Sequence, residues 1–251
     1  MTKTQRLRMT IDITMTILSI ILMGGNYLFP ADIVHEIIGV ALFVLWAIHI
    51  ILNRRWYASL AQASKLITST NANDRRSYSA LFRGKYTPYR VMQTIINCCI
   101  LICTIFLMIS GIILSNHIFT FLNIQGGLGF ARIAHLLASH WYYLFMSLHI
   151  GLHVGMIFGN KDTSTSAGPS TGSGTTRTAI LPRILLALAC IYGLYAFIAH
   201  GVWKYLILQQ QFFFFDLERG YILFAIDYIS IIILFATLSH LLAKSLKKGK
   251  L

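Results

Sequence analysis

Nine histidines stand in this chain, and four of them repeat one interval in two separate apolar segments. His35 and His49 are 14 residues apart in HEIIGVALFVLWAIH, and His135 and His149 are 14 residues apart in HLLASHWYYLFMSLH. On an α-helix, 14 residues return to within about 40° of the same face and advance roughly 21 Å. Each segment therefore predicts a helix with two imidazoles on one face, one near each end.

Imidazole nitrogens bind haem iron, and helical bundles build cofactor sites from side chains on facing helices. Titratable groups are costly at membrane depth, which makes histidines in apolar segments functional candidates. If the two helices run parallel, His35 faces His135 at one level, and His49 faces His149 at the other. The pattern predicts two haem b groups with these four axial ligands and no catalytic residue. The chain has no C-x-x-C-H motif, which excludes covalent c-type attachment of haem.

Four other residues near these levels are candidates for lesser roles. His140 is nine residues before His149, about 180° away on a helix, which favours packing; a local helix irregularity would make His140 a ligand instead. His153 follows His149 by one turn and is expected to bond a haem propionate or to replace His149. Arg54 and Arg55 could neutralise propionates through charge-assisted hydrogen bonds. Basic residues at that place also fit membrane topology alone.

The elements that must position these side chains are membrane spans. The chain has 251 residues, of which 56% are hydrophobic and 12% charged, and its mean hydropathy is +0.67. It contains apolar runs of about 20 residues, the length that a helix needs to cross a bilayer. This composition argues against a soluble domain. Six spans are predicted, at residues 8–29, 33–52, 89–115, 132–158, 181–203 and 221–243.

The basic residues predict the orientation of these spans. The formal net charge is +13, and the cations concentrate at the N-terminus, in the loop after the second span and in the C-terminal tail. Such an excess in cytoplasmic segments is the positive-inside rule, so it indicates lipid and topology rather than nucleic acid. We expect a multi-pass protein of the cytoplasmic membrane, with both termini cytoplasmic.

A polar segment divides the predicted spans into two groups. Residues 161–180 are rich in Gly, Ser and Thr, a composition that cannot build a core and is typical of a flexible linker. The expected fold is all-α, a six-helix transmembrane bundle. Its four-helix haem-binding core occupies residues 1–160, and two additional transmembrane helices occupy residues 181–251.

Three segments also carry a family resemblance. HEIIGVALFVLWAIHIILNRRW, HLLASHWYYLFMSLHIGLH and FFFFDLERGYILFAIDYISIIILF resemble the flavinylation-associated cytochromes (DUF4405-type), which are cytochrome b561-like membrane haem proteins. The resemblance implies a bacterial b-type cytochrome that passes electrons between a membrane donor pool, such as quinone, and an extracytosolic flavin-bearing protein. It also implies that His35, His49, His135 and His149 are the ligands. Such a chain is an electron-transfer subunit of an oxidoreductase system rather than a stand-alone enzyme.

Two other classes of function remain open. A transporter of metal ions or small solutes could bind its cargo with intramembrane histidines, but such proteins use broken helices and polar paths. The predicted spans contain few carboxylates; Asp227, which could relay protons, is one of them. A haem-free structural subunit would use its histidines for packing. The presence of haem separates both classes from an electron carrier.

Overall fold

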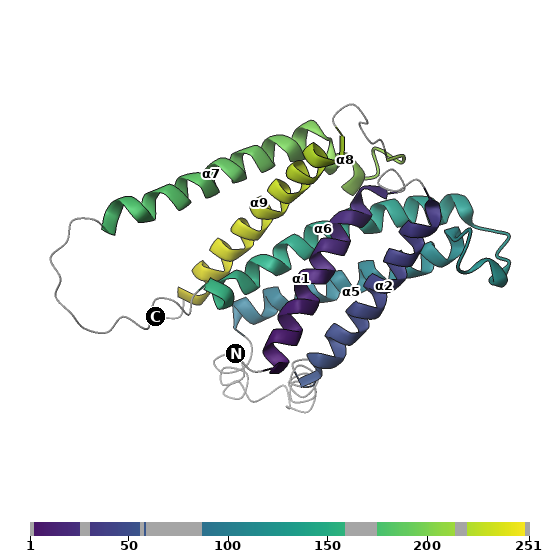
Figure 1. Ribbon diagram of the computed structural model, residues 1–251, viewed down its shortest axis with the longest axis horizontal. Coiled ribbons are helices and arrows are strands. Elements are labelled where there is room, and N and C mark those ends of the chain that lie inside the picture. The colour runs from purple at the N-terminus through teal and green to yellow at the C-terminus, as the bar shows by residue number, and fades with distance from the viewer. Residues whose placement is uncertain are drawn as a thin grey trace, which may run out of the picture. The chain divides into compact units, whose positions relative to one another are not determined.

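The computed structural model describes residues 3–25, 31–55, 58, 87–158, 175–213 and 220–248, and it is all-helical there (Figure 1). The all-α prediction is therefore confirmed for these residues. The elements are α1 (Lys3–Met23), α2 (Asp32–Leu52), α5 (Pro88–Leu114), the 3-10 helix η2 (Thr120–Leu122), α6 (Leu128–Phe158), α7 (Thr175–Ala199), α8 (Val202–Leu206) and α9 (Gly220–Lys248). Most of the predicted linker lies outside the described residues, at 161–174. The same is true of most of the loop after the second predicted span.

Four of these helices are long and apolar enough to cross a membrane. They are α2, α5, residues 181–199 of α7 and residues 220–247 of α9, with mean hydropathies from 1.9 to 2.5. They coincide with the second, third, fifth and sixth predicted spans, and they make the chain a multi-pass membrane protein. None of the residues of α2 is buried within the chain, as expected of a span whose surface meets lipid.

The first and fourth predicted spans are also long helices, α1 and α6, but they are more polar. α1 carries charged side chains in its first three turns, and the histidines, tyrosines and serines of α6 lower its hydropathy. The count of six spans thus stays a prediction. Both helices have the length for a crossing, 21 and 31 residues.

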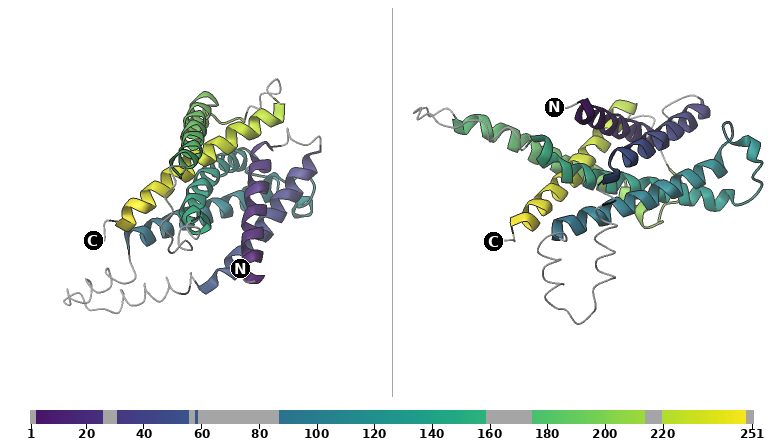
Figure 2. Two further views of the ribbon diagram at one scale, coloured as in Figure 1. Left: turned by 60° about the vertical axis from the view of Figure 1, so that its left-hand side comes forward. Right: turned by 90° about the horizontal axis from the view of Figure 1, so that it is seen from below.

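The chain divides into two compact units. The first unit comprises Met1–Ile95 and Thr104–Arg132, and the second comprises Ile96–Cys103 and Ile133–Leu251. In the first unit, α1 packs along α2, as the views in Figures 1 and 2 both show. In the second unit, α7 packs along α9.

Glu36 ties the start of α2 to the loop that follows α5 within the first unit. Ser115 Oγ and the Ile118 N–H donate to its Oε2 at 2.7 and 2.9 Å, and the Asn116 N–H donates to its Oε1 at 2.8 Å. Backbone N–H groups near apolar surroundings need such acceptors. The carboxylate thereby fixes the first turns of α2, which carry His35.

Glycine allows the helices of the second unit to approach closely. A Cβ on Gly193 of α7 would overlap the carbonyl group of Ser230 on α9, and a Cβ on Gly151 of α6 would overlap that of Ala236. Small residues at membrane helix contacts let backbones meet in this way. Ala196 and Ile231 are fully buried in the same unit. The α7–α9 contact therefore depends on the missing side chain at Gly193.

Gly193→Val is expected to lower the thermal stability of the purified protein in detergent. The added carbons must push α9 away from α7, and overpacking of this kind costs about 1–3 kcal/mol. Gly129→Val is the matched control, because a Cβ on Gly129 meets no atom within 4 Å. Equal melting temperatures for Gly193→Val and Gly129→Val would contradict the close contact.

Candidate functional site

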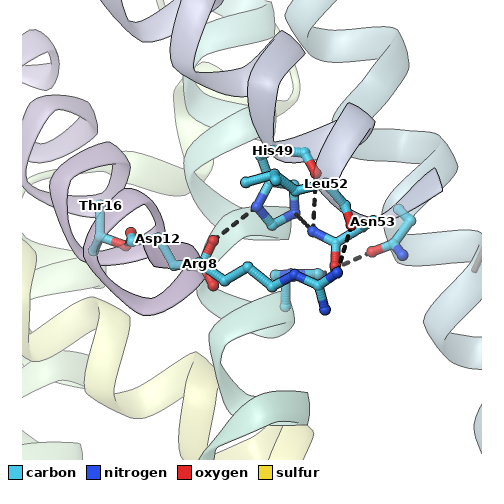
Figure 3. Close-up of polar contacts among 8 residues, drawn as sticks. Arg8, Asp12, Thr16, His49, Leu52 and Asn53 are labelled. Atoms are coloured by element: carbon cyan, nitrogen blue, oxygen red, sulfur yellow. Dashed lines mark hydrogen bonds and ion pairs between the residues drawn. The ribbon is translucent and has the colours of Figure 1, made fainter. Parts of the chain in front are cut away.

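His49 lies near the end of α2, and a carboxylate on α1 holds its ring (Figure 3). Nδ1 of His49 is 2.7 Å from Oδ1 of Asp12; the two side chains are 24% and 52% exposed. Nε2 is 3.4 Å from Nδ2 of Asn53, which also donates to the His49 carbonyl at 2.9 Å. A carboxylate only accepts, so it selects the tautomer with the proton on Nδ1. Nε2 of His49 then keeps its lone pair.

Arg8 makes the second polar contact between α1 and α2. Its Nη2 donates to the Leu52 carbonyl at 2.6 Å, and its Nε is buried without a hydrogen-bond partner among the described residues. The last carbonyls of a helix lack partners within it, and a cation there also favours the helix dipole. Arg8 and Asp12 are four residues apart, hence on one face of α1. That face therefore meets the end of α2 that carries His49.

His149 of α6 has an analogous arrangement in the second unit. Its Nδ1 is 2.8 Å from Oδ1 of Asn97 on α5. The amide oxygen can only accept, so Nδ1 donates and Nε2 of His149 keeps its lone pair. The ring of His153 lies beside it, with the ring centroids 4.5 Å apart and the planes tilted by 54°. The structure thus brings His149 and His153 together.

The other predicted site residues are distributed over both units. His35 and His135 are half-buried on α2 and α6, and His153 is also half-buried. Arg54 and Arg55 follow α2 and are exposed. His35 and His49 belong to the first unit, whereas His135 and His149 belong to the second. The pairing of His35 with His135 and of His49 with His149 stays a prediction.

His140 is packed inside the second unit. It is 1% exposed, its Nδ1 bonds the Leu136 carbonyl at 2.8 Å, and its ring stacks on Tyr205 of α8 with centroids 4.2 Å apart. Its Nε2 is buried without a hydrogen-bond partner among the described residues. A second ring, Phe213, lies 6.3 Å away. Aromatic stacking and the bond to its own helix therefore hold this imidazole.

A buried carboxylate links α7 to α9. Asp227 is 1% exposed; the Tyr192 hydroxyl donates to its Oδ1 at 2.5 Å, and Nε2 of His200 lies 2.7 Å from its Oδ2. Both carboxylate oxygens are thus satisfied, which is the condition for burying such a group. His200 directly follows the last residue of α7, Ala199. Nothing in the sequence pattern indicates that these three side chains meet.

Sequence reasoning missed four residues of the polar contacts around the histidines: Arg8, Asp12, Asn53 and Asn97. A signal for one of them was present, since Asp12 is the only acidic residue in the first predicted span, residues 8–29. An ionisable group within a span is a functional candidate. The two asparagines gave no such signal, because amides are common in helices for many reasons.

Four of the described helices, long and apolar enough to span a bilayer, define a multi-pass membrane protein. Two of its half-buried histidines, His49 and His149, each have Nδ1 bonded to a side-chain oxygen of another helix. The sequence model of the prokaryotic cytochrome b561 family matches residues 9–167, more than half of the chain. The chain belongs to this family, whose members are membrane proteins that bind b-type haem and transfer electrons. The search of curated proteins and the search of solved structures gave no match.

The family match confirms the cytochrome b561-like part of the resemblance noted from the sequence. The matched range contains His35, His49, His135 and His149, and it ends within the predicted linker. Described helices α7, α8 and α9 follow it. The flavinylation-associated subtype, the number of haems and the ligand assignment remain predictions.

Proposed function

We propose that this chain is a dihaem b-type cytochrome that carries electrons across the bilayer to or from an extracytosolic flavin-bearing partner. The observation that carries the proposal is the state of the two histidines of the predicted inner level. His49 and His149 each have Nδ1 bonded to a side-chain oxygen of another helix. Histidines that bind metals donate their other ring N–H in this way. Both residues thus fit the role of an axial ligand through Nε2.

Each histidine has a defined part in the proposal. His35 and His135 hold the outer haem, and His49 and His149 hold the inner one. Haem, when bound, supplies one-electron redox chemistry at each level. The 14-residue spacing separates the levels by roughly 21 Å along the helices, most of the ~30 Å hydrocarbon core. The apolar side chains of the helices would exclude water between the two haem levels. His153, Arg54 and Arg55 would form hydrogen bonds with the haem propionates.

The partners follow from the flavinylation-associated resemblance. A quinone or another membrane donor exchanges electrons with the cytochrome at one level, and a flavin borne by another chain exchanges them at the outer level. The lipid bilayer is the remaining partner. The chain acts as an electron-transfer subunit of an oxidoreductase system.

Transmembrane electron transfer tests this function in vesicles. The purified holoprotein is reconstituted into liposomes that enclose ferricyanide, and dithionite, which does not cross the bilayer, is added outside. We expect the enclosed ferricyanide to be reduced many times faster than in protein-free vesicles. His49→Ala should return the rate to that of protein-free vesicles. Equal rates with and without the wild-type protein would contradict the proposal.

The predicted topology decides which haem is the outer one. Reporters placed after Leu251 and near Ser170 should both indicate the cytoplasm, and one near Gln125 should indicate the outside. The cations gather at the N-terminus, in the loop after the second span and in the C-terminal tail, and the six predicted spans place the linker around Ser170 on the same side as these segments. Paired phosphatase and fluorescent-protein fusions measure both locations. A cytoplasmic signal at Gln125 with external signals at Ser170 and Leu251 would reverse the haem depths.

A further inference from the structure

The carboxylate of Asp12, which contacts His49, differs in charge from the amide of Asn97, which contacts His149, although the two contact distances are similar. Oδ1 of Asp12 is 2.7 Å from Nδ1 of His49, and Oδ1 of Asn97 is 2.8 Å from Nδ1 of His149. Both acceptors fix the tautomer with Nε2 unprotonated. Only Asp12 adds a formal negative charge. The chain therefore contains its own comparison between a charged and a neutral acceptor.

We propose that Asp12 is a positioning residue for His49 that lowers the reduction potential of the haem that His49 binds. The inference rests on the proposed function. A carboxylate that accepts the Nδ1 proton orients the ring and makes the imidazole a stronger donor. A stronger donor and a nearby negative charge both favour ferric over ferrous iron, and hydrogen bonding to ligands is one lever by which proteins set haem potentials.

The surroundings of Asp12 suit this role. It lies on the face of α1 that meets α2, one turn after Arg8, whose guanidinium bonds the Leu52 carbonyl. The Thr16 hydroxyl donates to the main-chain carbonyl of Asp12 and not to its carboxylate. The carboxylate contacts His49. A carboxylate near the start of the first span would be costly in lipid without a specific partner. His49 supplies that partner.

A redox titration of the purified holoprotein, followed by visible absorption, tests the proposal. Asp12→Asn keeps an oxygen that can accept the Nδ1 proton but removes the charge. We expect both haems to be retained and one of them to titrate higher. At a fixed potential, its ratio of reduced to oxidised iron should rise at least tenfold, which is about 59 mV for one electron. The other haem should be unchanged.

Three further variants complete the design. Asp12→Glu restores a carboxylate and should return the potential toward that of the wild type. Asn97→Asp places a carboxylate on His149 and should lower the potential of the haem bound there. Asp32→Asn is the charge-matched control, because Asp32 lies in the first turn of α2, roughly 25 Å from His49 at 1.5 Å per residue. It should leave the His49 haem unshifted.

The outcomes separate this inference from the proposed function. Two retained haems with unchanged potentials in Asp12→Asn, or an equal shift in Asp32→Asn, would overturn the inference and leave the cytochrome intact. A wild-type protein without haem would overturn both. If Asp12→Asn loses one haem, Asp12→Glu decides: recovery of the haem at the wild-type potential supports the role, and continued loss in Asp12→Glu refutes it.

Discussion

Alanine at His49 or at His149 is expected to remove one haem, the same one in both variants, and to leave the other. A methyl group cannot bind iron, so either change opens one axial position of the same low-spin centre. In the structure, Asp12 and Asn97 orient the rings of His49 and His149, and neither contact can replace a missing imidazole. Absorption spectra of the two purified variants should be superimposable, with about half of the wild-type haem.

The control for this pair is Asn53→Ala. Asn53 contacts Nε2 of His49 only at 3.4 Å and mainly bonds the backbone. The Asn53→Ala variant should therefore retain both haems. Different residual spectra for His49→Ala and His149→Ala would show that the two residues do not share a haem. Graded losses from all three variants would show that the histidines serve packing.

The outer pair gives the second large effect. His35→Ala and His135→Ala should each remove the outer haem and leave the inner haem, which His49 and His149 bind. His140→Ala should retain both, because its ring is held by Tyr205 and by the Leu136 carbonyl. The measurement is again the spectrum, combined with haem extraction.

The ligand assignment would be wrong if His140→Ala lost the outer haem while His135→Ala kept it. Helix α6 would then have to be irregular between Ala134 and Trp141 when haem is bound. A double variant, His135→Ala with His140→Ala, shows whether both histidines contribute to binding the outer haem or only one of them does. It should match His135→Ala if the assignment is correct.

Helix positions were largely predictable because hydropathy and helix-terminal residues act locally. The predicted second and third spans, residues 33–52 and 89–115, nearly coincide with α2 and α5. At α5, Thr87 accepts a hydrogen bond from the Arg90 N–H and Pro88 occupies the first turn, which are standard signals for a helix start. Such signals need no knowledge of neighbouring helices.

The start of α7 was less predictable. The polar composition indicated a linker up to residue 180, whereas the helix begins at Thr175. Threonine and arginine are compatible with a helix, so polarity alone does not end one. The predicted end of this span, residue 203, also differs from the structure, where α7 ends at Ala199. Gly201 follows with a φ of 60°, a conformation that suits glycine and separates α7 from α8.

The partners of the histidines could not be predicted, since they depend on how each helix is rotated about its axis. Spacing shows that His35 and His49 share a face, but not that Asp12 of α1 meets that helix near His49. The same holds for Asn97 with His149 and for Tyr192 with Asp227. These contacts arise from helix packing between distant parts of the sequence.

The haem content of the purified, full-length protein tests the central claim most directly. Protein from haem-replete cells, measured by absorption spectroscopy and by the pyridine haemochrome assay, should contain two b haems per chain. They should be low-spin, reducible by dithionite and fully extractable into acidified solvent. A colourless protein, or one that binds a single haem at saturation, would contradict the account.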